Sequence, residues 1–231
     1  LVKTPLPTLI LLAGGVIYTA RHRDWRQPAL LLTPVIVYFA FAMTGPFEIG
    51  YRHLLPILPF LFVFIGPLAN IQIEPFKWVK WIVPALIVWL IVGAIRIYPD
   101  YLAYFNEAAG GPAGGARILA DSNVDWGQDL PGLRDYINRE NLDSIYLSYF
   151  GSAPPTAYGI KTFQPLPSYP YNYPGVESNV GKLSNPPPGV YAISVTSLQG
   201  IFFKDRNLYG WFRARTPDAV IGHTIYVYRI K

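Results

Sequence analysis

The chain contains no cysteine among its 231 residues, and only 14% of the residues are charged. The absence of cysteine excludes a disulfide framework and any thiolate metal site. Scarce charge combined with 52% hydrophobic residues is atypical of a soluble domain of this length and indicates a membrane protein. The net charge of +5 is modest, and the basic residues are scattered, so the composition disfavours a nucleic-acid-binding protein.

Four apolar runs in the first hundred residues predict about four transmembrane helices. Each run approaches the roughly 20 residues that a hydrocarbon core requires. None has a polar face at helical spacing, which a surface helix of a soluble protein should have. We therefore expect an α-helical membrane region over residues 1–97, followed by a small α/β domain over residues 98–231, with spans near residues 5–20, 28–44, 54–70 and 81–97.

The basic residues near the span ends predict the orientation of the chain. One side carries more of them than the other, and the richer side is normally cytoplasmic. We therefore expect the α/β domain to be extracytoplasmic. The chain also begins at Leu1 without a signal-peptide pattern, and we expect it to be a fragment of a longer protein. The richer side has Arg21, Arg23, Arg26, Lys77 and Lys80, and the other has Lys3, Arg52 and Arg96.

Beyond residue 97, helical and strand patterns alternate, which predicts a small α/β sheet. We expect a short surface helix at residues 101–108, then a flexible glycine-rich connection at residues 109–117. Asp129 is expected to cap a helix that runs to about Asn141. A Pro, Tyr and Asn tract at residues 151–188 is expected to be a long external loop. The other predicted elements are strands at 144–149 and 190–195, a helix at 205–215, and a strand pair at 219–221 and 225–230.

The stretch PFEIGYRHLLPILPF, residues 46–60, places Glu48, Arg52 and His53 between two apolar runs. Ionisable residues at a membrane surface are costly and often serve a substrate pathway, so this cluster is the first functional candidate. A guanidinium at the head of a membrane helix can bind a phosphate bidentately, with help from the helix N-terminus. An arginine that only snorkels to ordinary lipid headgroups would occupy the same position. Position alone does not decide between the two.

The string DSNVDWG begins like a calcium-binding loop, with Asp121, Asn123 and Asp125 at alternate positions. The match then fails, because Trp126 stands where the loop needs glycine and Gly132 where it needs glutamate. Asx turns and helix capping explain the same residues, and we favour that interpretation. No cofactor is predicted, and a divalent metal is neither supported nor excluded. The three histidines, which are far apart in sequence and predict no metal site, are His22, His53 and His223.

Several strings resemble one enzyme family. The segment YRHLLPILPFLFVFIG is similar to a stretch near the end of the membrane region of polytopic GT-C superfamily glycosyltransferases. These are the group of protein O-mannosyltransferase and aminoarabinose-transferase-like enzymes called family 39. The strings YPDYLAYFNEAAGGPAGGARILADSNVDWGQDLPGL, PPGVYAISVTSLQG and IGHTIYVYRI resemble the C-terminal region of bacterial members. The resemblance extends from about Gly45 onward, and SNVDWGQDL is its most specific part.

The resemblance implies transfer of a sugar from a polyprenyl-phosphate carrier to an acceptor on the outer face of a bacterial inner membrane. By this analogy Arg52 would face the carrier phosphate, supported by Tyr51 and His53. The polar loop that would face the site comprises Asp121, Asn123, Asp125, Trp126 and Gln128.

The chain departs from the family, because the family's catalytic acidic residue lies in an N-terminal loop that this sequence does not contain. Glu48 is a weak candidate to replace it. We therefore expect the chain to need an N-terminal membrane region or partner subunits, and to be inactive alone. The alternative is a non-catalytic membrane scaffold or accessory subunit of the same architecture. A transporter is disfavoured, because no span carries a buried charge pair and no inverted repeat is visible.

Overall fold

A computed structural model of the chain describes residues 1–22, 24–44, 50–70, 77–170, 176 and 181–231. The chain forms two compact units. The first, called the helical unit, comprises Leu1–Tyr101 and Phe105–Gly111. The second, called the α/β unit, comprises Leu102–Tyr104 and Pro112–Lys231. The segment Phe105–Gly111 therefore packs with the helices, although it follows the last of them in sequence.

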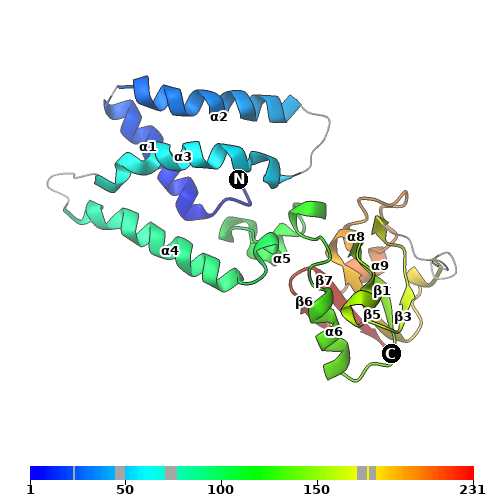
Figure 1. Cartoon of the computed structure of the whole chain (residues 1–231). Coiled ribbons are helices and arrows are strands. Elements are labelled where there is room, and N and C mark those ends of the chain that lie inside the picture. The colour runs from blue at the N-terminus through cyan, green and yellow to red at the C-terminus, as the bar shows by residue number, and fades with distance from the viewer. Residues whose placement is uncertain (23, 45–49, 71–76, 171–175, 177–180) are drawn as a thin grey trace. The chain divides into compact units, whose positions relative to one another are not determined.

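The helical unit contains a set of apolar helices that run alongside one another (Figure 1). One helical stretch changes type twice, from 3₁₀ to α and back, and Pro56 lies inside its first part. Proline lacks the N–H that a continuous α-helix needs, which accounts for this break. The helices are α1 (Leu6–His22), α2 (Arg26–Thr44), η1 (Tyr51–Ile57), α3 (Leu58–Ile65), η2 (Gly66–Asn70), η3 (Lys77–Trp81) and α4 (Ile82–Ile97), followed by the turns η4 (Tyr101–Ala103) and η5 (Glu107–Ala109).

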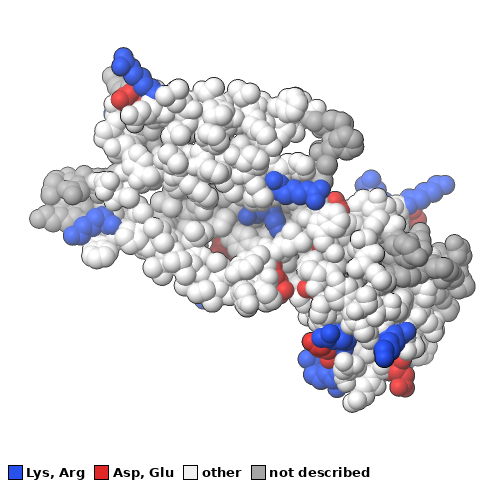
Figure 2. Space-filling view, viewed as in Figure 1, with Lys and Arg blue, Asp and Glu red and all other residues white. Residues whose placement is uncertain are grey.

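Three helical stretches are long and apolar enough to cross a membrane: Arg26–Thr44, Tyr51–Asn70 and Val79–Ile97. The expected first span coincides with α1, whose 17 residues make it shorter than these three. At 1.5 Å per residue α1 is about 25 Å long, near the lower limit for a hydrocarbon core. Figure 2 shows the charged side chains at the helix ends and over the α/β unit, while the helix flanks on this face are almost entirely uncharged.

Helix α1 packs closely on α3 because it carries glycine at the contact. A Cβ atom added to Gly15 would lie 2.9 Å from the ring of Phe64. Small residues that allow such an approach are typical of helix contacts inside membranes, where dispersion contacts replace the hydrophobic effect. The contact anchors α1 beside the stretch that carries Arg52.

The α/β unit is built on a five-stranded mixed sheet of order β3-β1-β5-β7-β6 (Figure 1). Strands β3, β1 and β5 are parallel, whereas β7 runs antiparallel to both of its neighbours. The strands are β1 (Ile145–Ser148), β3 (Phe163–Pro165), β5 (Gly189–Ser194), β6 (Ala219–Ile221) and β7 (Ile225–Ile230), and β2 (Phe150–Gly151) pairs separately with β4 (Tyr169–Pro170).

Alternate residues of the strands enter two hydrophobic cores, one on each face of the sheet. Ala192 joins the core formed with α6 (Leu130–Arg139), whereas Tyr191 and Ile193 join the core on the other face. That second core includes residues of α8 (Val195–Gln199) and α9 (Gly210–Arg213). This alternation is the period of two expected of strands buried on both faces. The remaining short helices are α5 (Gly111–Gly115), η6 (Asp121–Asn123), η7 (Pro155–Tyr158) and η8 (Gly181–Leu183).

The predicted helical region and following α/β unit are confirmed, as are the strands near residues 144–149 and 190–195 and the closing strand pair. Four predictions of local secondary structure are wrong. The glycine-rich connection expected at 109–117 contains the short helix α5 (Gly111–Gly115). The helix expected over residues 205–215 is reduced to α9, because the Asp205 carboxylate accepts the Asn207 N–H at 2.8 Å and forms a turn. The expected external loop contributes the edge strand β3, where Pro165 is tolerated. The expected surface helix at 101–108 is replaced by the turns η4 and η5.

Candidate functional site

Tyr51, Arg52 and His53 form the first residues of η1, directly before the apolar helix α3. The Arg52 Nε donates to His53 Nε2 at 3.4 Å, and both side chains are exposed. The Tyr51 hydroxyl accepts a hydrogen bond from Thr4 Oγ1 at 3.3 Å. The three predicted residues therefore lie at the end of the helical unit where α1 begins. Glu48 lies outside the described residues.

Asn106 joins two further segments to this end of the unit. Its Nδ2 donates to the carbonyls of Leu1 at 3.1 Å and Thr4 at 2.9 Å, and its Oδ1 accepts from the Ala109 N–H at 3.1 Å. The side chain is only 3% exposed, so these bonds are shielded from water. Asn106 was not predicted as a site residue, although Asn106 and Glu107 are the two strongly polar residues of the string YLAYFNEA and were a usable signal.

Lys3 and Glu107 add charge at the same end. The Lys3 ammonium lies 4.4 Å from the centre of the Phe105 ring, and burial lowers the pKa of Lys3 to about 8. The Glu107 Oε1 accepts a hydrogen bond from the Trp89 indole at 3.0 Å. Trp89 lies eight residues before the end of α4, which is about 12 Å along the helix axis. Glu107 therefore reaches back along a helix of membrane-spanning length.

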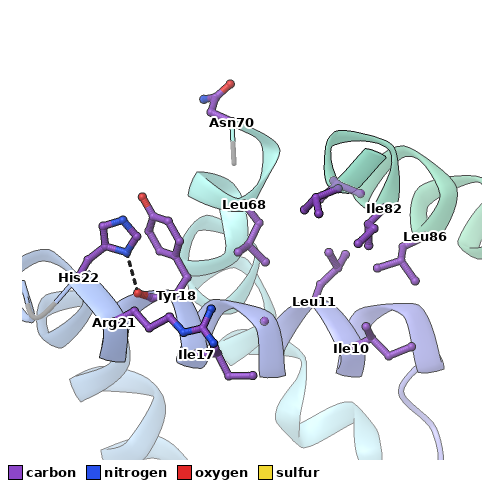
Figure 3. A pocket seen from close by; sticks show the side chains of 13 residues that line it. Ile10, Leu11, Ile17, Tyr18, Arg21, His22, Leu68, Asn70, Ile82 and Leu86 are labelled. Atoms are coloured by element: carbon purple, nitrogen blue, oxygen red, sulfur yellow. Dashed lines mark hydrogen bonds between the residues drawn. The ribbon is translucent and has the colours of Figure 1, made fainter. Parts of the chain in front are cut away.

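A cavity of about 660 Å³ runs along α1 from Ile10 to His22 (Figure 3). Its walls are mainly apolar, and Leu11, Leu68 and Ile82 point toward one another. Arg21 and His22 lie at one side, where His22 Nδ1 is 2.9 Å from the Tyr18 carbonyl oxygen. The cavity walls do not include Tyr51, Arg52 or His53, so within the described residues the cavity is distinct from the Arg52 cluster.

The segment SNVDWGQDL lies in the α/β unit and turns two carboxylates inward. Asp125 accepts hydrogen bonds from the Gly127 N–H at 2.9 Å and from Ser194 Oγ at 2.7 Å, and is 1% exposed. Asp129 precedes α6 but does not cap it with its side chain, contrary to our prediction. Its Oδ2 instead accepts from Thr224 Oγ1 at 2.5 Å. The segment therefore joins α6 to the ends of β5 and β7.

Burial raises the pKa of Asp125 to about 7. The hydrogen bonds from Gly127 and Ser194 oppose this shift, whereas the neighbouring charges of Asp129 and Asp121 add to it. Asp125 is therefore mainly protonated at pH values below about 7.

Of the other predicted loop residues, Asp121 donates its backbone N–H to Thr196 Oγ1 at 3.2 Å, whereas Asn123 and Gln128 make local hydrogen bonds. The Asn123 amide donates to the Ala120 carbonyl at 3.4 Å, and the Gln128 side chain bridges the Trp126 N–H and the Val124 carbonyl at 2.8 and 3.0 Å. The Asp121 backbone has a positive φ of 61°. Within the part of the chain that the structure describes, no group of three or more metal-ligating side chains occurs.

An aromatic cluster adjoins this segment. Trp126 is 50% exposed and lies 5.7 Å, between ring centres, from the buried Phe150. Phe202 stacks on Tyr169 at 4.0 Å and on Phe150 at 5.7 Å. No local sequence pattern predicts this cluster, because its members are separated by up to 76 residues in the chain.

A comparison with protein-family models, with curated proteins and with solved structures finds no match to this chain.

Proposed function

We propose that the chain is the C-terminal portion of a membrane glycosyltransferase, which transfers a sugar from a polyprenyl-phosphate carrier to an extracytoplasmic acceptor. In this proposal the helical unit lies in the bacterial inner membrane and binds the carrier. The α/β unit lies outside the cytoplasm. An N-terminal membrane region or partner subunits complete the site.

The observation that carries the proposal is the meeting of polar groups at one end of an apolar helical unit. The Thr4 hydroxyl bonds to Tyr51, and the Thr4 carbonyl accepts from Asn106. Through these bonds Lys3, Arg52 and Glu107 are brought toward one end of helices whose other basic side chains, such as Arg21 and Arg96, lie near the helix ends. An amphiphile with an anionic headgroup matches this distribution, because its tail can lie along the helices while its phosphate faces the cations.

Each charged residue has a distinct role in the proposal. Arg52 binds the phosphate of the carrier, since a guanidinium offers two parallel donors to phosphate oxygens. The contact with His53 orients the Arg52 side chain. Glu107 is a candidate to accept the proton of the acceptor, because general-base catalysis needs a positioned carboxylate and the Trp89 indole holds this one.

The proposal predicts that the α/β unit is extracytoplasmic. Cysteine introduced at the exposed Asn185 should react with a membrane-impermeant thiol reagent in intact cells, and the chain contains no native cysteine to interfere. Cysteine introduced at the exposed Asp24, which follows α1, is the matched control and should react only after lysis. The reverse pattern would overturn the proposed orientation.

Carrier binding tests the proposed function itself. The full chain in zwitterionic-lipid nanodiscs should bind a labelled polyprenyl phosphate saturably. A polyprenol of the same length, which lacks the phosphate, should compete at least about tenfold less well, because it cannot make the charge-assisted bonds. Equal competition by the two compounds would favour a scaffold that binds the isoprenoid tail only as ordinary lipid.

A further inference from the structure

A second group of cationic side chains lies in the α/β unit and includes none of the residues of the candidate site. A cavity of about 610 Å³ opens between the segment after α5, the end of α8, the segment after α9 and strand β7. The residues that define its chemistry are Arg117, Gln199, Arg213, Arg215 and Tyr226.

The cavity lining is positively charged without compensation. It contains three arginines and, within the described part of the chain, no aspartate or glutamate. Arginine stays protonated at any pH relevant to a cell, so three positive charges face one space at all times. Like charges gathered in this way repel one another unless an anion joins them.

Two of the three guanidiniums are held in fixed positions. Arg213 donates to the carbonyls of Leu198 at 2.8 Å and Arg206 at 3.2 Å, and to the Asn207 Oδ1 at 2.7 Å. Arg215 donates to the Trp211 carbonyl at 2.8 Å, and its guanidinium carbon lies 3.2 Å from the centre of the Trp211 ring. Side chains fixed in advance lose little conformational entropy when a ligand binds.

Arg117 differs from these two. In the described part of the chain its side chain makes no hydrogen bond and no ion pair, although its backbone N–H donates to the Gly114 carbonyl at 3.1 Å, and its charge acts on the hydroxyl of Tyr226, which also lines the cavity. Burial raises the pKa of that Tyr226 hydroxyl, whereas the Arg117 charge lowers it. The guanidinium N–H groups of Arg117 are therefore available to a ligand.

We propose that this cavity binds a small phosphate-class anion, which is either a soluble phosphate ester or the phosphate headgroup of a lipid. Arg117 and Arg215 provide bidentate contacts to the phosphate oxygens, and Arg213 adds positive charge from its fixed position. Arg117 lies 96 residues before Arg213 and 98 residues before Arg215 in the sequence. Only the fold brings Arg117 close to the other two arginines. The proposal is independent of sugar transfer and of Arg52.

The test uses the full chain in zwitterionic-lipid nanodiscs, with inorganic pyrophosphate titrated in a calorimeter at low salt. We expect saturable binding that weakens as salt is added. Arg117→Gln and Arg215→Gln should each weaken pyrophosphate binding about 10- to 100-fold, because each removes one charge-assisted pair of bonds. Arg117→Lys, which retains the charge but not the planar fork, should recover only part of the affinity.

The matched control is Arg139→Gln, which removes an exposed arginine of α6 outside the cavity and should leave pyrophosphate binding unchanged. A second arm distinguishes the two sources of phosphate. If nanodiscs that contain phosphatidylglycerol weaken pyrophosphate binding in the native chain more than in Arg117→Gln, the ligand is a lipid headgroup, and if they do not, it is soluble. The proposal is wrong if the native chain binds no pyrophosphate, or if Arg117→Gln and Arg139→Gln behave alike.

Discussion

Replacing Asp125 with asparagine should raise the free energy of unfolding by up to about 4 kcal/mol at pH 8 and change it little at pH 4. Burial raises the pKa of Asp125 to about 7, whereas in the unfolded chain an aspartate titrates near pH 4. Between these two values the folded protein holds a proton that the unfolded chain releases. Native stability should therefore fall as the pH rises from about 4 to 7, and then level off.

Asparagine is neutral at every pH, so it removes this dependence. Its amide oxygen can still accept the Gly127 N–H, and its NH₂ can donate to Ser194 Oγ, which keeps both contacts of Asp125 but reverses the direction of the Ser194 hydrogen bond. Melting of the full chain in detergent, followed by near-ultraviolet circular dichroism from pH 4 to pH 8, measures the effect. Asp135→Asn is the control, since the Asp135 side chain is 65% exposed. Parallel pH profiles for native protein and Asp125→Asn would show that Asp125 is ionised in the folded state.

Replacing Arg52 with alanine should weaken binding of polyprenyl phosphate about 10- to 100-fold. A charge-assisted bidentate contact at the edge of a membrane contributes about 1.5 to 3 kcal/mol, more than an exposed ion pair. Arg52→Lys should recover little of this affinity, because an ammonium lacks the fork geometry. Equilibrium binding of the labelled carrier in nanodiscs gives the comparison.

Arg96→Ala is the matched control for Arg52. Arg96 is an exposed arginine in the last turn of α4, on the same expected side of the membrane. If Arg52→Ala and Arg96→Ala weaken polyprenyl-phosphate binding equally, the effect is a general attraction between cations and phosphate. Arg52 would then only snorkel to lipid headgroups. Loss that is specific to position 52 supports a defined phosphate site.

The coarse architecture was predictable because periodicity and apolar length are local properties of a sequence. The runs that became α2, α3 and α4 could be identified without knowledge of their neighbours. So could β5 and β7, whose residues alternate between two cores. Helix α6 was also predicted correctly, but the hydrogen bonding of Asp129, the residue before it, was not. Aspartate is a residue type that often caps helices, yet the Asp129 carboxylate instead accepts a hydrogen bond from Thr224, 95 residues away in the sequence.

The polar sites depended on contacts between distant segments, which no local pattern encodes. Tyr51 and Arg52 were recognisable from their place between apolar runs, but their partner Thr4 was not, because it lies 47 residues before Tyr51. Asn106 contacts Leu1 across 105 residues. The cavity of Arg117, Arg213 and Arg215 is likewise a product of the fold. In each case the residue type was visible in the sequence, whereas its neighbours were not.

The most direct test of the central claim is transfer of a labelled sugar from its polyprenyl-phosphate carrier, measured in membranes of cells that make the protein and of cells whose gene for it is deleted. We predict that the deletion abolishes transfer, that the native gene restores it, and that Arg52→Ala does not, although the variant protein is present in the membrane at the native level. Transfer that persists after the deletion, or that Arg52→Ala restores in full, would contradict the account.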